Sequence, residues 1–152
     1  MTIRDLFNQK ETQESVERIN TLSPATKALR GKMNVTQMLA HCNVAYEITY
    51  TAKHPKPKGF EKFMIKLFAK NAVVGLKPYP KNERTAPVFL ITDEGDFELE
   101  KQNLLAHLHK TQQLGASHFN GKENAAFGCL TENSWDTLFS KHLDHHLRQF
   151  GV

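Results

Sequence analysis

Apolar residues recur at intervals of three and four along much of the chain, which is the spacing of one face of an α-helix. The clearest stripe, at positions i, i+3, i+4, i+7 and i+8, consists of Phe60, Phe63, Met64, Leu67 and Phe68. We expect this stripe to lie in the hydrophobic core, on a helix that is either a lid or an addition packed on a bundle; the alternative is that it contacts a cofactor or substrate. Periodicity and capping residues together predict helices over residues 3–21, 34–53, 59–71, 96–115 and 131–150, where Asn34 or Thr36 can begin the second helix and Asp93 or Asp96 the fourth.

Prolines mark the connections between these helices. His54-Pro55-Lys56-Pro57 ends the second helix, because a residue that precedes proline is displaced from the α region. Residues 73–95 contain further prolines that forbid a long helix. The short apolar run Val88-Phe89-Leu90-Ile91 can be extended, but one strand does not make a sheet. The pattern therefore predicts an all-α bundle with an extra helix and a long proline-containing loop on its surface, between helices two and three of the bundle.

Composition narrows the class of protein. A chain of 152 residues is the size of a single domain, here residues 1–152. It has no run of roughly 18 apolar residues and no apolar leader, so we expect no membrane partner and no secretion. Cys42 and Cys129 lack metal-type spacing, and we expect reduced thiols and a cytoplasmic location. The net charge of +4 is scattered, without a basic helical stripe, so we expect no nucleic-acid partner.

Histidines gather near the C-terminus, where residues 142, 145 and 146 are three of the eight in the chain. With about 100° per residue, His142 and His146 lie about 40° apart on the last helix, on the same side as Trp135 and Leu138. His145 lies about 60° to the other side, at the edge of this inward arc. Histidines spaced i, i+4 can reach one metal ion, so His142 and His146 are candidate ligands.

A third imidazole is expected on the second helix. His41 projects among its apolar positions, where a polar ring without a partner is unfavourable. His41, His142 and His146 would together give a metal site with room for water or substrate. The alternative is that these histidines are core groups, which donate to backbone carbonyls or pair with Asp144 or Glu47. The same two carboxylates are candidates for the groups that orient metal-binding imidazoles.

Other catalytic motifs are missing. No glutamate directly follows His142, as the zinc-protease pattern requires. Cys42 adjoins His41 in sequence, but neighbours on a helix diverge by about 100°, which argues against a Cys–His nucleophile. The chain has no glycine-rich phosphate loop. The histidines remain the strongest candidates for chemistry.

Two segments carry a resemblance to a known family. His142-Leu143-Asp144-His145-His146-Leu147-Arg148-Gln149 is similar to the fourth-helix signature of the DinB-like (DinB/YfiT) superfamily, and residues 34–41 resemble its second helix. More narrowly, residues 32–41, 127–131 and 135–152 resemble an uncharacterised bacterial subfamily, a domain of unknown function. The resemblance implies a four-helix bundle of up-down-down-up topology. It also implies a divalent metal, zinc or nickel most often, bound by His41, His142 and His146. Leu147 departs from the common pattern, in which arginine directly follows the last histidine.

Three functions follow from such a site. A divalent ion with three imidazole ligands keeps an open position and lowers the pKa of a bound thiol or water. Some DinB-like relatives use a low-molecular-weight thiol, which implies a thiol S-transferase acting on a small-molecule substrate; activated water would instead give a hydrolase. The third reading is a non-catalytic bundle with a structural metal or a core histidine cluster. His145 and His118 are candidate proton donors or acceptors. A homodimer through an exposed apolar face of the N-terminal helix is also expected.

Overall fold

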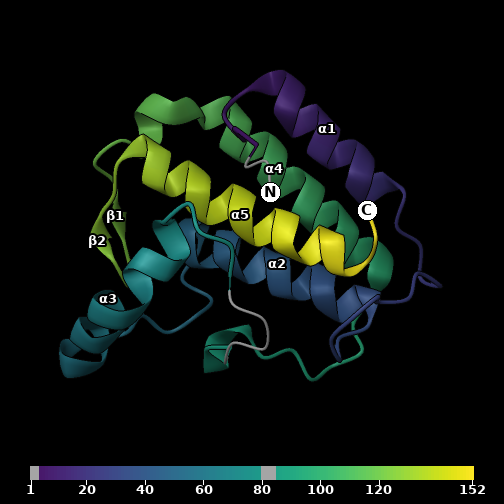
Figure 1. Cartoon of the computed structure of the whole chain (residues 1–152), viewed down its shortest axis with the longest axis horizontal. Helices are drawn as coiled ribbons and strands as arrows, with labels where there is room; N and C mark the ends of the chain where they lie inside the picture. Colours follow the sequence, from purple (N-terminus) through teal and green to yellow (C-terminus); the bar gives the residue numbers. More distant parts are fainter. Residues whose placement is uncertain (1–3, 80–84) are drawn as a thin grey trace.

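The computed structural model describes residues 4–79 and 85–152, and most of these residues are helical (Figure 1). The α-helices are α1 (Gln9–Asn20), α2 (Val35–Tyr50), α3 (Gly59–Val74), α4 (Phe97–Phe119) and α5 (Glu132–Gln149). A 3-10 helix, η1, spans Pro87–Phe89, and strands β1 (Glu123–Asn124) and β2 (Gly128–Cys129) form an antiparallel pair. The expectation of a helical protein is confirmed; the two-residue strands were not predicted.

Side-chain caps set the beginnings of three of the helices as the sequence indicated. Asn34 accepts from the backbone N–H of Gln37, whose side chain in turn accepts from the Asn34 N–H, so α2 begins with a capping box. Asp96 accepts from the N–H of Leu99 at the start of α4, and Thr131 does the same for Ser134 in α5. These bonds satisfy backbone donors that the first turn of a helix leaves without partners.

The first helix is shorter than predicted. Ile3 lies outside the described residues, and α1 begins only after Asn8, which accepts from the N–H groups of Lys10 and Glu11. The exposed side of α1 is polar, with Gln13 and Glu17, whereas its apolar side chains are buried. A homodimer was expected through an exposed apolar face of this helix. In the structure α1 exposes no apolar face of that kind.

A kink carries α4 beyond its expected end. Gly115 has φ +73°, a conformation that glycine adopts without strain, and helical residues continue to Phe119. Phe119 is fully buried and its ring meets those of Trp135 and Phe139. Packing of this aromatic side chain explains why residues 116–119, predicted to be a loop, form a last helical turn.

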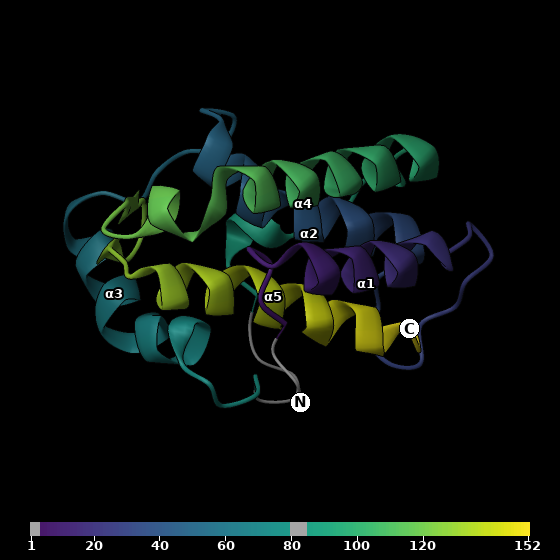
Figure 2. The ribbon, with the colours of Figure 1, turned by 90° about the horizontal axis from the view of Figure 1, so that it is seen from above.

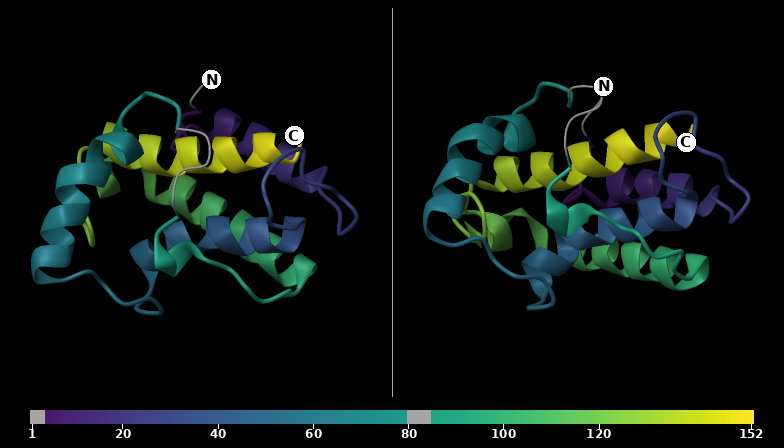
Figure 3. Two further views of the ribbon diagram at one scale, coloured as in Figure 1. Left: turned by 60° about the horizontal axis from the view of Figure 1, so that its bottom comes forward. Right: turned by 90° about the horizontal axis from the view of Figure 1, so that it is seen from below.

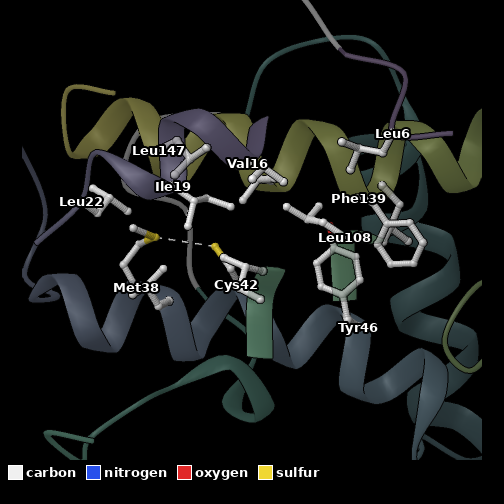
Figure 4. Close-up of a cluster of buried hydrophobic side chains, with 14 of the residues drawn as sticks. Leu6, Val16, Ile19, Leu22, Met38, Cys42, Tyr46, Leu108, Phe139 and Leu147 are labelled. Atoms are coloured by element: carbon white, nitrogen blue, oxygen red, sulfur yellow. Dashed lines mark hydrogen bonds between the residues drawn. The ribbon is translucent and has the colours of Figure 1, made fainter. Parts of the chain in front are cut away.

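Helices α1, α2, α4 and α5 lie side by side and enclose the core (Figure 2). Leu6, Ile19, Met38, Leu108 and Leu147 are among its side chains, each at most 1% exposed (Figure 4). Aromatic rings fill the half near the start of α5, where Tyr46 stacks on Phe139 with ring centroids 4.7 Å apart. One hydrophobic cluster thus joins the four helices.

Helix α3 lies at one end of the molecule, and none of its residues is buried (Figure 3). The aromatic stripe was predicted to lie in the core, but Phe60, Phe63, Leu67 and Phe68 are exposed. The opposite face of the helix, with Ile65, Ala69 and Val73, packs partly against the core. The prediction was wrong because periodicity shows which face of a helix is apolar, but not which face the fold covers.

The segment after α3 also differs from expectation. Residues 80–84, including Pro80, lie outside the described residues. Val88 and Phe89, in the apolar run interpreted as part of a surface loop, belong to η1, which contacts α2. This part of the loop covers candidate site residues, as described below, and is more than a surface connection. Among the described residues, no helix is long and apolar enough to span a membrane.

Candidate metal centre

Three imidazoles meet between α2 and α5. His41 comes from the middle of α2, and His142 and His146 come from successive turns of α5. The ring centroids are 5.0 Å apart for His41 and His142, 4.3 Å for His41 and His146, and 4.7 Å for His142 and His146. One ring nitrogen of each lies within 4.8 Å of the corresponding atoms of the other two. The convergence expected from the helical projections is confirmed, and we call these residues the triad.

The orientation of His41 is set by η1. Its Nδ1–H donates to the backbone carbonyl oxygen of Phe89 at 2.8 Å, because a carbonyl can only accept. A neutral imidazole protonated at Nδ1 presents an unprotonated Nε2, and this atom faces Nε2 of His142 at 3.0 Å. The Phe89 ring also contacts both imidazoles, with centroids 5.3 Å from His41 and 5.6 Å from His142. The loop residue Phe89 thus fixes one ring and shields two.

His146 is held from within its own helix. Its Nδ1 lies 2.7 Å from Oε1 of Gln149, an acceptor three residues along α5. This bond again leaves Nε2 for a ligand, in the arrangement by which outer hydrogen bonds orient metal-binding histidines. The backbone oxygen of Gln149 also accepts from the N–H of Leu29 at 2.7 Å. The contact between His146 and Gln149 could have been predicted from sequence, because residues three apart on a helix are neighbours. The contact between His41 and the Phe89 carbonyl could not, because the two residues are 48 apart in sequence.

Burial keeps the triad neutral. Desolvation lowers the pKa of His41, and it lowers that of His142 well below its usual range, helped by the neighbouring imidazoles. Desolvation likewise lowers the pKa of His146 to about 3. Neutral imidazole is the form that binds metal. His41 and His146 are buried, whereas His142 is closely surrounded yet keeps part of its surface accessible, so the site is not sealed.

The geometry fits a divalent ion. Metal–nitrogen bonds of about 2.0–2.1 Å in a tetrahedral site place two ligand nitrogens roughly 3.3 Å apart, close to the 3.0 Å between the two facing Nε2 atoms. Three neutral nitrogen donors, two of them with fixed Nδ1 partners, are a suitable set for zinc and for similar metals. The triad is therefore able to hold a metal ion.

Neither carboxylate expected beside the triad is bonded to it, which corrects that prediction. Asp144 forms ion pairs with Arg18 at 3.0 Å and Arg148 at 2.8 Å, on the side of α5 that faces α1. Glu47 pairs with Lys53 at 2.8 Å and with His54 at 2.6 Å. Both carboxylates are drawn to nearby cations, and the triad is oriented by a carbonyl and an amide instead.

The two candidate proton-transfer residues lie in different places. His145 is half-buried beside the triad, with its ring centroid 5.0 Å from that of His146 and 5.4 Å from that of Tyr79. His118 is exposed in the last turn of α4. This turn lies near the start of α5, because the N–H of Gly121 donates to the carbonyl oxygen of Leu130. His142 lies ten residues after the first residue of α5, which is about 15 Å along the helix axis. The structure therefore brings His145 to the site and leaves His118 away from it.

Comparison with known proteins gives one match. The family model described as "Protein of unknown function (DUF1569)" matches residues 2–151. No curated protein and no solved structure matches the chain. The match covers nearly the whole sequence, including all three histidines of the triad. The chain belongs to the DUF1569 family.

Proposed function

We propose that this chain is a divalent-metal-binding protein with His41, His142 and His146 as ligands, and that it is a metal-dependent enzyme acting on small molecules. The observation that carries the proposal is the convergence of three neutral imidazoles while His142 remains partly accessible. A purely structural zinc site is usually closed by four protein ligands. Among the described residues three side chains meet, and His142 keeps part of its surface accessible.

The residues around the triad have distinct roles in this proposal. Phe89 and Gln149 hold the rings of His41 and His146 so that their Nε2 atoms point inward. A divalent ion, zinc or nickel, would supply Lewis acidity that lowers the pKa of a bound thiol or water. His145 is the group placed to accept a proton, since desolvation lowers its pKa and keeps it in the basic, neutral form.

Among reaction classes we favour thiol S-transfer. A low-molecular-weight thiol would lose its proton, its sulfur would form a bond to an electrophilic carbon, and the leaving group would depart. The support is the DinB-like resemblance of residues 34–41 and 142–149. We propose that α1, α2, α4 and α5 correspond to that superfamily's up-down-down-up bundle, with α3 as an addition. The free thiols of Cys42 and Cys129 support a reducing, cytoplasmic location.

The first test is metal content. Protein purified without a histidine tag and supplied with zinc or nickel should hold one ion per chain, measured by elemental analysis after desalting. His142→Ala and His146→Ala should each lose the ion, because two imidazoles bind far more weakly than three. His109→Ala, on the exposed side of α4, is the matched control and should keep it. Full metal content in both triad variants would refute the site.

The second test is a screen of thiols against electrophiles with metal-loaded protein, with His41→Ala as the blank. Thioether formation that requires both thiol and metal supports the transferase. Consumption of the electrophile at the same rate without thiol would identify a hydrolase instead.

The competing candidate is a non-catalytic bundle. It is favoured by the 3.0 Å contact between the Nε2 atoms of His41 and His142, which is also the length of a direct hydrogen bond if His142 carries its proton on Nε2. Protein that holds one ion per chain yet turns over no electrophile would favour a structural metal. Protein that binds no metal would favour a core histidine cluster.

A further inference from the structure

The outer face of α3 is a continuous apolar surface. Phe60 is 75% exposed, Phe63 58%, Leu67 57% and Phe68 69%, and Leu76, just beyond the helix, is 75% exposed. In a helical projection the four α3 side chains fall within an arc of about 140°. Scattered exposed apolar residues need no explanation, but a contiguous stripe of this kind marks an interaction surface. We call Phe60, Phe63, Leu67 and Phe68 the α3 face.

This face cannot turn inward, because the opposite side of α3 is fastened to the protein. Lys62 forms an ion pair with Glu123 of β1 at 3.2 Å. At the end of the helix, the fully buried Lys141 of α5 donates to the carbonyl oxygens of Ala72 and Gly75, the latter at 2.8 Å. The α3 face is thus held outward, on a helix that lies at one end of the molecule (Figure 3).

The surroundings of the α3 face are strongly basic. Residues 53–77 contain seven lysines and one acidic residue, Glu61. Exposed lysines stand before the helix at positions 56 and 58, beside the stripe at 66 and after the helix at 77. A helix with Phe and Leu on one side and lysines around it is the pattern of a segment that lies in a lipid–water interface. The charge also attracts the anionic headgroups of a membrane surface.

We propose that the α3 face docks on an anionic lipid surface, with its Phe and Leu side chains among the headgroups and acyl chains and the surrounding lysines against the anionic lipids. A second copy of the chain is the less suitable occupant, because pairing through this face would oppose two lysine-rich segments. The proposal departs from the expectation of no membrane partner, because the lack of a spanning segment says nothing about binding at a membrane surface; no described helix can span a membrane. It does not depend on the metal site.

Vesicle flotation tests the proposal. The full chain should float with vesicles of phosphatidylcholine and phosphatidylserine, bind phosphatidylcholine alone much less, and dissociate as salt is raised. Phe63→Ser together with Leu67→Ser should weaken binding at least about tenfold, because each removes an apolar side chain from the interface. Both side chains are exposed, so the variant should fold as the wild type does, which circular dichroism checks.

Two variants serve as matched controls. Leu99→Ser removes an equally exposed leucine from α4, at 57%, and should bind vesicles as wild type does. Lys56→Glu with Lys58→Glu should weaken binding, whereas Lys27→Glu, at an exposed position on another segment, should have a much smaller effect.

Two outcomes would overturn the proposal. One is equal binding to neutral and anionic vesicles. The other is no binding to either; a dimer in sedimentation velocity that Phe63→Ser with Leu67→Ser abolishes would then assign the α3 face to a second copy. None of these outcomes would alter the metal content, so the metal proposal is tested separately.

Discussion

At the scale of single residues, the triad depends on hydrogen-bond acceptors as much as on histidines. An imidazole presents a lone pair at Nε2 only when its proton is kept on Nδ1, and the Phe89 carbonyl and the Gln149 amide oxygen provide that restraint. The two acceptors come from different sources, one from the backbone of a short 3-10 helix and one from a side chain of α5. Only the second can be removed by substitution.

Gln149→Ala should weaken metal affinity by about 10- to 100-fold, because the His146 ring loses the acceptor that sets its tautomer and orientation. Competition titration with a chromophoric chelator measures this change. Gln102→Ala, at an exposed position on α4, is the control. Unchanged affinity in Gln149→Ala would show that packing alone orients His146.

A second single-residue feature is the carboxylate of Asp136. Its Oδ1 accepts from the N–H of buried Leu6 at 2.8 Å, and desolvation raises its pKa to about 7. Between pH of about 4 and 7 the folded state therefore binds a proton that the unfolded state does not. The free energy of unfolding contributed by Asp136 should fall as pH rises through this window.

Asp136→Asn keeps the acceptor for the Leu6 N–H and removes the charge. Relative to wild type it should gain about 1–2 kcal/mol of stability on going from pH 4 to pH 8, which is less than the roughly 4 kcal/mol that three pKa units represent because the carboxylate is partly exposed and its interactions are screened by solvent. Urea unfolding across that range measures the difference, with Asp93→Asn, an exposed site in the loop before α4, as the control. A parallel pH dependence in Asp136→Asn and wild type would contradict this assignment.

At the scale of elements, α3 is attached to the rest of the protein along one side, mainly through α5. Its apolar face is outward, and Lys141 ties its last turn to α5 through the Ala72 and Gly75 carbonyls. The ammonium group also lies 4.3 Å from the centroid of the Tyr79 ring. A cation at the C-terminal end of a helix is additionally favoured by the helix dipole.

Lys141→Met should weaken the packing of α3 on the protein without unfolding the core. The free energy that holds α3 in place should fall by about 1–3 kcal/mol, because two hydrogen bonds from a charged donor are lost. Hydrogen exchange should show faster exchange of α3 amides, while α2 and α4 amides keep their protection. Lys10→Met, on the exposed start of α1, should leave both unchanged. Uniformly faster exchange in all the helices would mean that Lys141 supports the global fold.

At the scale of the whole molecule, the triad joins distant parts of the chain. His41 and His142 are 101 residues apart in sequence, yet they meet where α2 and α5 pack. A ligand that binds only the folded state stabilises it by mass action. A metal bound to the triad would therefore hold together two helices that the chain itself does not connect directly.

Zinc or nickel should raise the thermal midpoint of wild type, by an amount equivalent to about 2.7 kcal/mol when free metal is 100-fold above its dissociation constant. His142→Ala should show no rise, and His109→Ala should behave as wild type. A chelator should return wild type to its metal-free midpoint while the protein stays folded, since the hydrophobic cluster that joins the four helices is built from other residues. Unfolding on chelation at ambient temperature would favour a structural ion.

Much of the fold followed from local patterns. The starts of α2, α4 and α5 were predicted because capping acts within four residues of sequence. The pairing of His142 with His146, and the inward position of His41, followed from the period of a helix. The partners of Asp144 and Glu47 could not be predicted in the same way, because which charges approach a carboxylate depends on how helices and loops meet.

The sequence by itself determined that the chain is helical, where most helices begin, and that three imidazoles lie on inward faces, because these properties depend on short-range geometry. Only the tertiary structure decided that the Phe89 carbonyl orients His41, that Asp144 belongs to arginines, and that the α3 face points outward. Each of these depends on which surfaces the folded chain brings together. A hydrophobic period is the same whether or not another element covers it.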